Sequence, residues 1–294
     1  MDLAQLLLTG IAVGFIYGLI AMGFVLIYKS SGVFNFAQAG LVMVGAWFLW
    51  SFLSWTALPL WAAIILTMVV SGLLGWVIQF LFLKPLVGQP LFSLVMITIA
   101  LSAAIDGIVV TIWGGPTRTL PFALPGPSTV NLGPLLITVE YLWVIGACGI
   151  ALLIFFAFFK FTKLGLGMRA SSDNQMVGLS CGIPLSTTLA WAWILSSVLA
   201  AVAGIFLGLR VGLTTQLSMV GMKALPVVLL GGLESLGGAL IAGLIIGVAE
   251  MLAGAYLDPL VGGGLKDIFP FIIMIAILLF RPQGLFGWER IERV

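Results

Sequence analysis

The sequence predicts an all-α polytopic membrane protein with about eight to nine transmembrane helices, some of them short or broken. Of its 294 residues, 62% are hydrophobic and only 7% are charged, and the mean hydropathy is +1.27. A soluble domain carries about 25% charged residues. The apolar residues also gather in runs near the roughly 20 residues that a helix needs to cross a hydrocarbon core about 30 Å thick. Together these observations exclude an ordinary soluble domain.

Nine apolar runs are predicted to span the membrane. They cover residues 3–28, 33–53, 60–82, 91–113, 141–159, 187–209, 217–231, 237–255 and 268–280. The N-terminus carries Asp2 instead of a basic region, and the run after it is longer than the apolar core of a signal peptide, so insertion without cleavage is expected. We treat residues 1–294 as a single transmembrane domain.

Basic residues predict the orientation, because loops on the cytoplasmic side carry an excess of Lys and Arg. Eight fall on one side of the predicted spans: Lys29, Lys84, Lys160, Lys163, Arg169, Arg281, Arg290 and Arg293. Three fall on the other side: Arg118, Arg210 and Lys266. We therefore expect the N-terminus outside and the C-terminus in the cytoplasm.

The first span carries Gly10, Gly14 and Gly18, one at every fourth position. Such a ridge lets another helix approach closely. Tight internal packing and contact with a second membrane subunit are both open for this face.

Two segments depart from plain spans, one in each half of the chain. Residues 33–40 read VFNFAQAG and place two amides at the start of an apolar helix. Residues 219–247 read MVGMKALPVVLLGGLESLGGALIAGLIIG, and the run at 217–231 has 15 residues, about 22 Å of helix, which is short for a crossing. Interrupted segments in both halves indicate an inverted repeat and the substrate path of a transporter.

The ends of these broken helices are the predicted translocation path, because free backbone amides and a partial positive charge suit a substrate carboxylate. The path residues are Asn35, Phe36, Gln38, Gly40, Lys223, Gly231, Gly232, Ser235 and Gly238. In the alternative, Asn35 and Gln38 form hydrogen bonds with neighbouring helices, each worth about 0.6 kcal/mol in a membrane.

Three ionisable residues lie within the predicted spans, where a charge at mid-membrane costs at least about 2.5 kcal/mol. Asp106 and Glu250 are functional candidates for that reason, and their spacing predicts no cationic partner. Lys223 either pairs with an acid or extends its ammonium group toward water, and we expect the second. Two isolated acids do not form a proton relay, which argues against a proton-coupled carrier.

The longest outer loop runs from about residue 114 to 140. It holds five prolines: Pro116, Pro121, Pro125, Pro127 and Pro134. Prolines exclude a regular helix, so a stiff, irregular cap is expected. The loop either docks an extracytoplasmic binding protein or connects two spans passively.

The predicted inner loop at about residues 160–186 is polar between two long apolar runs. Residues 160–184 read KFTKLGLGMRASSDNQMVGLSCGIP. Ser171 or Ser172 can act as an N-cap, and Gly182 followed by a proline provides a stop. We expect an amphipathic helix of about ten residues that presses its apolar side into a soluble partner. The alternative is an ordinary polar loop.

Several kinds of chemistry are absent from the chain. It has no histidine, and its two cysteines, Cys148 and Cys181, lie in unlike surroundings. Histidine-based metal sites and Ser-His or Cys-His nucleophiles are therefore excluded, and no disulfide framework is expected. No G-x-x-x-x-G-K-[ST] occurs, so we expect the chain to bind no ATP. We also expect it to bind no other cofactor, metal or nucleic acid, and to be no enzyme.

Four blocks of the sequence carry a family resemblance. They are GFIYGLIAMGFVLIYKSSGVFNFAQAG, the inner loop, GMKALPVVLLGGLESLGGALIAG and LLFRPQGLFG. Together they resemble the H-type permease subunit of branched-chain amino acid (Liv) ABC importers. Gln38 stands where many members of that family have His, and Gly178 stands where Ala is expected.

The resemblance implies a permease subunit that moves a small amino acid of branched-chain type, or a related polar solute. The implied partners are a different, M-type permease subunit, two ATPase subunits that bind ATP, and a periplasmic or other extracytoplasmic binding protein. The implied location is the inner or plasma membrane of a bacterium or archaeon. Relatives serve urea, amides and other organic acids, so the cargo stays open, and so does a pair of identical permeases.

The resemblance also assigns ATPase coupling to the inner loop. The residues concerned are Arg169, Ala170, Ser171, Asp173, Asn174, Val177, Gly178 and Gly182. The rival interpretation is a self-sufficient secondary carrier or facilitator, which would share the broken helices but would have no use for a docking loop.

Overall fold

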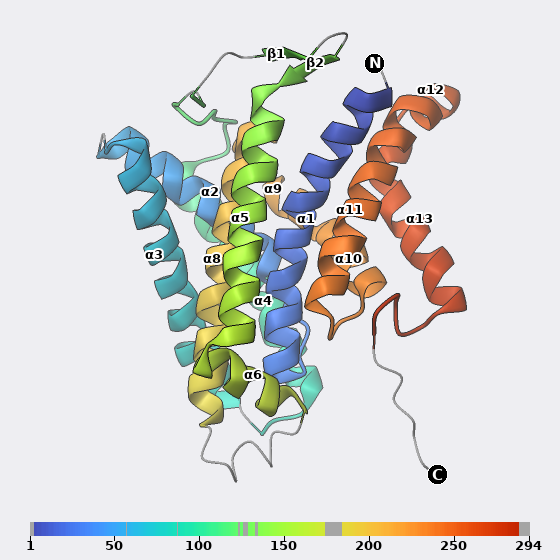
Figure 1. The fold of residues 1–294 in the computed structure, drawn as a ribbon. Coiled ribbons are helices and arrows are strands. Elements are labelled where there is room, and N and C mark those ends of the chain that lie inside the picture. The colour runs from blue at the N-terminus through green and yellow to red at the C-terminus, as the bar shows by residue number, and fades with distance from the viewer. Residues whose placement is uncertain are drawn as a thin grey trace. The chain divides into compact units, whose positions relative to one another are not determined.

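The computed structural model describes residues 3–56, 58–86, 88–122, 124–125, 129–132, 135–173 and 184–287, most of which lie in helices (Figure 1). The chain separates into two compact units. Unit 1 comprises residues 1–25, 123–149 and 223–294, whereas unit 2 comprises residues 26–122 and 150–222.

Seven helices in the described residues are long and apolar enough to cross a membrane. They are Leu3–Ser31, Gln38–Trp55, Leu60–Leu86, Leu91–Trp113, Val139–Phe161, Leu185–Val211 and Leu236–Val261. Two shorter apolar elements, Leu217–Gly231 and α13 (Leu265–Phe280), account for the remaining two predicted spans. The predicted all-α polytopic fold is therefore confirmed.

Unit 2 is built around α8 (Leu185–Val211), which packs against both α2 (Gln38–Trp55) and α3 (Leu60–Ile78). Glycine permits the close approach of α3 and α8, since a Cβ atom added at Gly75 would lie 2.5 Å from the Trp193 carbonyl oxygen. This crossing places the turn of α3 that follows Gly75 directly against α8.

The other elements of unit 2 surround this centre. They are the end of α1 (Leu3–Ser31), the π-helix η1 (Gln79–Leu83), the 3₁₀-helix η2 (Lys84–Leu86), α4 (Leu91–Trp113), the end of α5 (Val139–Phe161), α6 (Lys163–Asp173) and α9 (Leu217–Met222). Helices α4 and α9 both pack on α2. A Cβ atom at Gly40 would lie 3.1 Å from Ile105 of α4, and one at Gly221 of α9 would lie 3.4 Å from Ala39.

Unit 1 contains the starts of α1 and α5 and the C-terminal helices. The latter are α10 (Ala224–Gly231), α11 (Leu236–Leu252), the π-helix η3 (Ala253–Leu257), α12 (Asp258–Val261) and α13. Helices α1 and α11 cross at glycines, because a Cβ atom at Gly14 would lie 2.7 Å from Leu244 Cα, and one at Gly243 would lie 2.7 Å from the Gly14 carbonyl oxygen. The glycine ridge of the first span therefore serves packing inside unit 1.

A short hairpin corrects the expectation of an irregular outer loop. Strands β1 (Thr129–Leu132) and β2 (Leu135–Thr138) pair antiparallel, with Thr129 opposite Thr138. Their sequences, TVNL and LLIT, are rich in β-branched and apolar residues, which favour strands. The prolines of this loop exclude a helix but leave room for a two-stranded ribbon.

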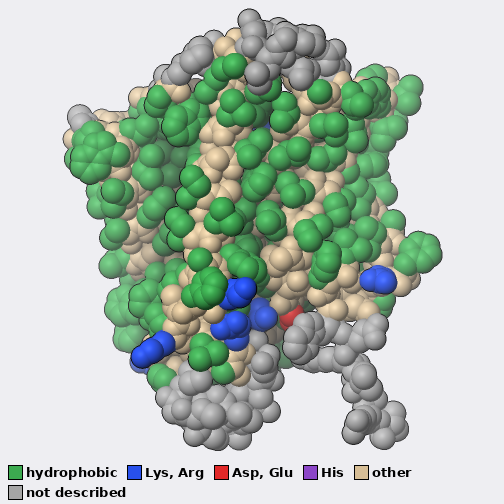
Figure 2. Space-filling model, in the orientation of Figure 1, with side chains coloured by type: hydrophobic (Ala, Val, Ile, Leu, Met, Phe, Trp, Pro, Cys, Tyr) green, Lys and Arg blue, Asp and Glu red, His purple; other side chains and the backbone are tan. Residues whose placement is uncertain are grey.

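The helix surfaces are strongly apolar. Trp61 and Leu73 of α3, Phe92 of α4 and Leu153 of α5 are between 60% and 71% exposed. Figure 2 shows apolar side chains over much of one face, with many of the visible Lys and Arg side chains gathered around α6 at its lower end. Such surfaces suit contact with lipid.

Candidate functional site

Residues 32–37 of unit 2 interrupt the helical run between α1 and α2, as the sequence predicted. Asn35 in this break is fully buried. Its Oδ1 atom accepts a hydrogen bond from the Ala37 amide at 3.1 Å, and its carbonyl oxygen accepts one from the Gln38 amide at 3.2 Å. This Asx-type turn leads the chain into α2 and occupies an amide that the sequence analysis treated as free for a substrate.

Gln38 links the break to α8. Its Oε1 atom accepts hydrogen bonds from Ser196 Oγ at 2.7 Å and from Asn35 Nδ2 at 3.4 Å, and its Nε2 atom donates to the Ser196 carbonyl oxygen at 3.3 Å. All three residues are 0% exposed. For Gln38 the structure therefore shows the interhelical bonding that was left open as an alternative.

Thr98 of α4 ties a third helix to the same break. Its hydroxyl accepts from the Phe36 amide at 3.3 Å and lies 2.8 Å from the Val95 carbonyl oxygen and 3.4 Å from that of Phe34. The break is thus a buried polar network that fixes α2, α4 and α8 relative to one another inside unit 2.

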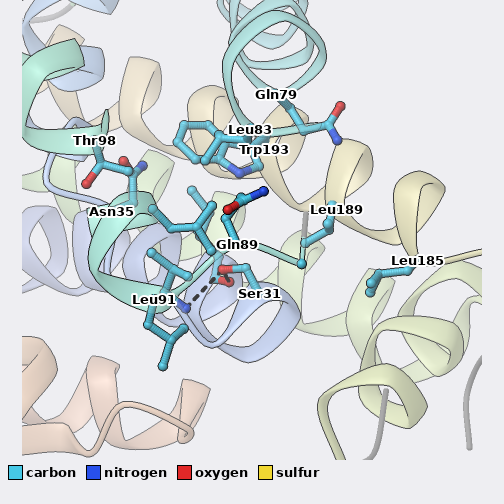
Figure 3. A pocket seen from close by; sticks show the side chains of 14 residues that line it. Ser31, Asn35, Gln79, Leu83, Gln89, Leu91, Thr98, Leu185, Leu189 and Trp193 are labelled. Carbon is cyan, nitrogen blue, oxygen red and sulfur yellow. Dashed lines mark hydrogen bonds between the residues drawn. The ribbon is translucent and has the colours of Figure 1, made fainter. Parts of the chain in front are cut away.

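A cavity of about 240 Å³ lies beside this network (Figure 3). Its walls come from the end of α1, from η1, and from the first turns of α4 and α8. Asn35, Gln79, Thr98 and Trp193 are buried on the inside, whereas Gln89 is exposed. None of its 14 lining residues is charged. The volume is below the roughly 300–1,000 Å³ typical of pockets for drug-sized ligands, so the cavity suits a small solute. The uncharged lining favours a solute that is itself uncharged or internally neutralised.

Gln79, like Thr98, is a buried polar residue of this cavity that the sequence analysis missed. It is 2% exposed, and its Nε2 atom has no hydrogen-bond partner among the residues that the structure describes. It opens the π-helix η1, in which the Lys84 amide donates to the Gln79 carbonyl oxygen. Single π-turns inside α-helices are frequent at functional sites. An amide inside an apolar span was the signal available in the sequence.

The second interrupted segment divides at Lys223, between α9 and α10, and again at residues 232–235, between α10 and α11. The prediction of broken helices is confirmed here as well. Pro226 lies in the first turn of α10, where a missing backbone N–H leaves no hydrogen bond unmade. The first bend therefore falls at Lys223 and not at the proline.

Lys223 pairs with two acids, so the expectation that it extends toward water is wrong. Its Nζ atom lies 2.8 Å from Glu250 Oε1 and 2.6 Å from Asp267 Oδ1. The reversal between α10 and α11 brings Lys223 and Glu250 together although they lie 27 residues apart. Asp106, the other acid singled out, lies near Ser218 of α9, and its Oδ1 atom has no hydrogen-bond partner among the described residues.

At the α10–α11 turn, backbone atoms occupy the space that a side chain would need at each glycine. A Cβ atom at Gly231 would lie 2.6 Å from the Gly238 carbonyl oxygen, and one at Gly232 would lie 2.5 Å from the Gly287 amide. Ser235 Oγ accepts from the Gly238 amide at 3.0 Å, so this helix end, predicted to be free, is capped by its own side chain. The assignment of these residues to the path stays a prediction.

The inner loop contains helix α6, which the sequence analysis did not predict. Ser171 and Ser172, the predicted caps, lie at the end of α6, and the stretch up to Gly182, where a helix was predicted, falls outside the described residues. Thr162 caps the start of α6, because its Oγ1 atom accepts from the Gly165 amide at 3.0 Å. Arg169, Ala170 and Asp173 also lie on α6. Four further coupling residues lie outside the described part of the chain: Asn174, Val177, Gly178 and Gly182.

Helix α6 is amphipathic and is anchored to its own unit. Met168 and Ser171 are buried, whereas Leu166 is 60% exposed. Arg169 donates from Nη2 to the Lys160 carbonyl oxygen at 3.1 Å and lies 5.9 Å from the Phe159 ring. Basic side chains complement the C-terminal carbonyls of a helix, so Arg169 holds α6 against the end of α5.

Multi-pass helices, buried polar breaks and a small uncharged cavity define a membrane permease. The chain belongs to the family described as branched-chain amino acid transport system / permease component, whose model matches residues 6–278. The resemblance seen in the sequence is thereby confirmed.

Relatives cover almost the whole chain. The high-affinity branched-chain amino acid transport system permease protein LivH of Salmonella typhimurium is 29% identical over 99% of this chain and 97% of its own. BraD of Pseudomonas aeruginosa, which carries the same description, is 28% identical over the same shares. In solved structures, PsaBC from Streptococcus pneumoniae in complex with Fab matches with a TM-score of 0.49 and 14% identity, over 97% of this chain and 94% of that chain.

Proposed function

We propose that this chain is one of two transmembrane subunits of an ABC importer for a small amino acid of branched-chain type or a related polar solute. The observation that carries the proposal is the family match over residues 6–278, joined by relatives whose names state permease proteins of branched-chain amino acid transport systems. A binding protein outside the cell delivers the solute, and no bond in the solute changes. The chain is therefore a transporter subunit and not an enzyme.

Separate ATPase subunits supply the energy in this proposal. The sequence holds no phosphate-binding loop, so ATP binds to the partners and this chain carries no cofactor. The second permease is a different, M-type chain of the same class. The proposed location is the inner or plasma membrane of a bacterium or archaeon.

The proposed orientation has the inner loop and the C-terminus in the cytoplasm. It is supported inside unit 2 by the convergence of Lys29 and Arg169, which both lie 5.9 Å from the Phe159 ring. Arg118, by contrast, pairs with Leu213, just beyond the C-terminal end of α8. An excess of basic residues at one end is typical of the cytoplasmic side.

The test is to purify the tagged chain in mild detergent from its native host and to reconstitute what co-purifies into liposomes. We expect two ATPases and a second permease, and ATP-dependent uptake of leucine once the matching binding protein is added. A chain that purifies alone and moves solute without ATP would overturn the proposal and establish a secondary carrier.

A further inference from the structure

The cavity of unit 2 holds an amide whose donor is unused. Gln79 is 2% exposed, and within the described residues no acceptor meets its Nε2 atom. A buried polar group without a hydrogen bond destabilises the fold, because it has lost its bonds to water and gained none in return. A ligand that brings an acceptor into the cavity would remove this penalty, so Gln79 indicates a binding site and not only a packing position.

Helix ends supply both signs of partial charge around the same cavity. The N-termini of α4 and α8 border it at Leu91 and Leu185, and neither has a side-chain cap. The last turn of α1 borders it at Ile27 and Ser31. Helix N-termini carry partial positive charge and C-termini partial negative charge. In Figure 3, Gln79 and Leu189 lie on one side of Gln89, and Ser31 and Leu91 lie on the other.

The cavity walls are otherwise aliphatic. Seven of its 14 lining residues are Leu, Ile or Val, and no lining residue is charged. A solute with a net charge would find no counter-ion there, whereas a zwitterion carries its own. Urea or a short amide would leave the aliphatic walls uncovered, so the lining favours a solute with a branched apolar side chain.

We propose that this cavity is a solute-binding site for a zwitterionic amino acid with an aliphatic side chain, placed at the predicted cytoplasmic end of the path. Gln79 Nε2 donates to the carboxylate, the ammonium group faces the last turn of α1 near Ser31, and the side chain lies against Leu83 and Leu189. The site rests on the proposed function, because it names where the transported solute binds.

The test measures binding without transport. The assembled transporter, in lipid nanodiscs without ATP or binding protein, is titrated with radiolabelled L-leucine. Gln79→Met keeps the size of the side chain and removes the donor. Because a hydrogen bond to a charged group is worth more than a neutral one, we expect affinity to fall by at least about tenfold. Gln216→Met, which changes an exposed glutamine outside the cavity, is the matched control and keeps full affinity.

Competing ligands test the assigned contact. Isoamylamine lacks the carboxylate, so it should compete equally weakly in the parent and in Gln79→Met. Leucine binding that is the same in both proteins, with unchanged thermal unfolding, would overturn the site. If leucine is still taken up with ATP in that case, the proposed function stands without the site. If the parent neither binds leucine nor takes it up, the proposed cargo falls too.

Discussion

Lys223 bridges one buried and one exposed carboxylate in unit 1. The Glu250 side chain is 2% exposed and that of Asp267 is 68% exposed. The Glu250 Oε2 atom has no hydrogen-bond partner among the described residues, and within that part of the chain the ion pair of this carboxylate is with Lys223. Removing one partner of a buried pair leaves an uncompensated charge and costs about 3–5 kcal/mol, whereas an apolar replacement of both is often neutral.

We therefore expect Lys223→Met to lower the free energy of unfolding by about 3–5 kcal/mol and the double variant Lys223→Met/Glu250→Leu to recover most of it. Asp267→Asn, which removes the exposed acid, should cost about 1 kcal/mol or less. Unfolding in detergent, followed by tryptophan fluorescence, gives the three values.

Additive losses in the double variant would contradict this account of the pair. Transport by the refolded double variant separates the roles of Lys223. Normal uptake makes Lys223 a packing residue, whereas lost uptake in a stable protein supports its assignment to the translocation path.

Residue-scale prediction succeeded where polar side chains stand out in an apolar run and failed where the identity of the partner depends on the fold. The polar break at Asn35 and Gln38 was visible because amides stand out in an apolar run. The partner of Lys223 was not, because Glu250 approaches only after the α10–α11 reversal. Gln79 carried the same signal as Gln38 but stood alone in its span.

At the scale of elements, α6 has one buried face and one exposed face. Met168 and Ser171 are buried on one side, whereas Lys163 and Leu166 are exposed on the other. Thr162 caps the start of the helix, and Arg169 holds it to the end of α5. The exposed side is therefore available to a partner while the buried side maintains the fold.

We expect Leu166→Ser to weaken association with the ATPases and to reduce ATP-driven uptake severalfold, with thermal unfolding unchanged. Met168→Ala on the buried side should instead lower the stability by about 2–5 kcal/mol, the range for truncating a buried Met. Co-purification of ATPases and unfolding curves measure the two effects. Equal loss of ATPase from both variants at unchanged stability would contradict the division of faces.

At the scale of elements, length and hydropathy predicted the helices well, whereas the residues that cap the helices were predicted less well. The seven long spans were readable because about 20 apolar residues have few alternatives to a membrane helix. Helix α6 was not predicted, because the residue that caps its start, Thr162, lies before the stretch in which Ser171 and Ser172 were taken as caps. The hairpin was missed because the prolines of the outer loop were taken to exclude regular structure, although the β-branched residues of β1 and β2 favour strands.

At the scale of the whole chain, four separated blocks were enough to predict the family, and the match over residues 6–278 confirmed it. The cavity could not be predicted in the same way. Its lining residues come from four stretches of unit 2, and each stretch alone reads as an apolar helix end or a loop. Orientation in the membrane stays a prediction, and it decides on which side of the membrane the cavity lies.

Single cysteines on unit 2 test that orientation. In a background with Cys148→Ala and Cys181→Ser, Lys163→Cys marks the end with α6, and Thr119→Cys marks the end with Arg118; both positions are exposed. On intact spheroplasts, we expect a membrane-impermeant maleimide to label Thr119→Cys alone, because the positive-inside bias places Lys163 in the cytoplasm. Lys163→Cys should react only after lysis. The reverse pattern would place the cavity at the outer face, where it would receive solute from the binding protein and could no longer lie at the cytoplasmic end of the path.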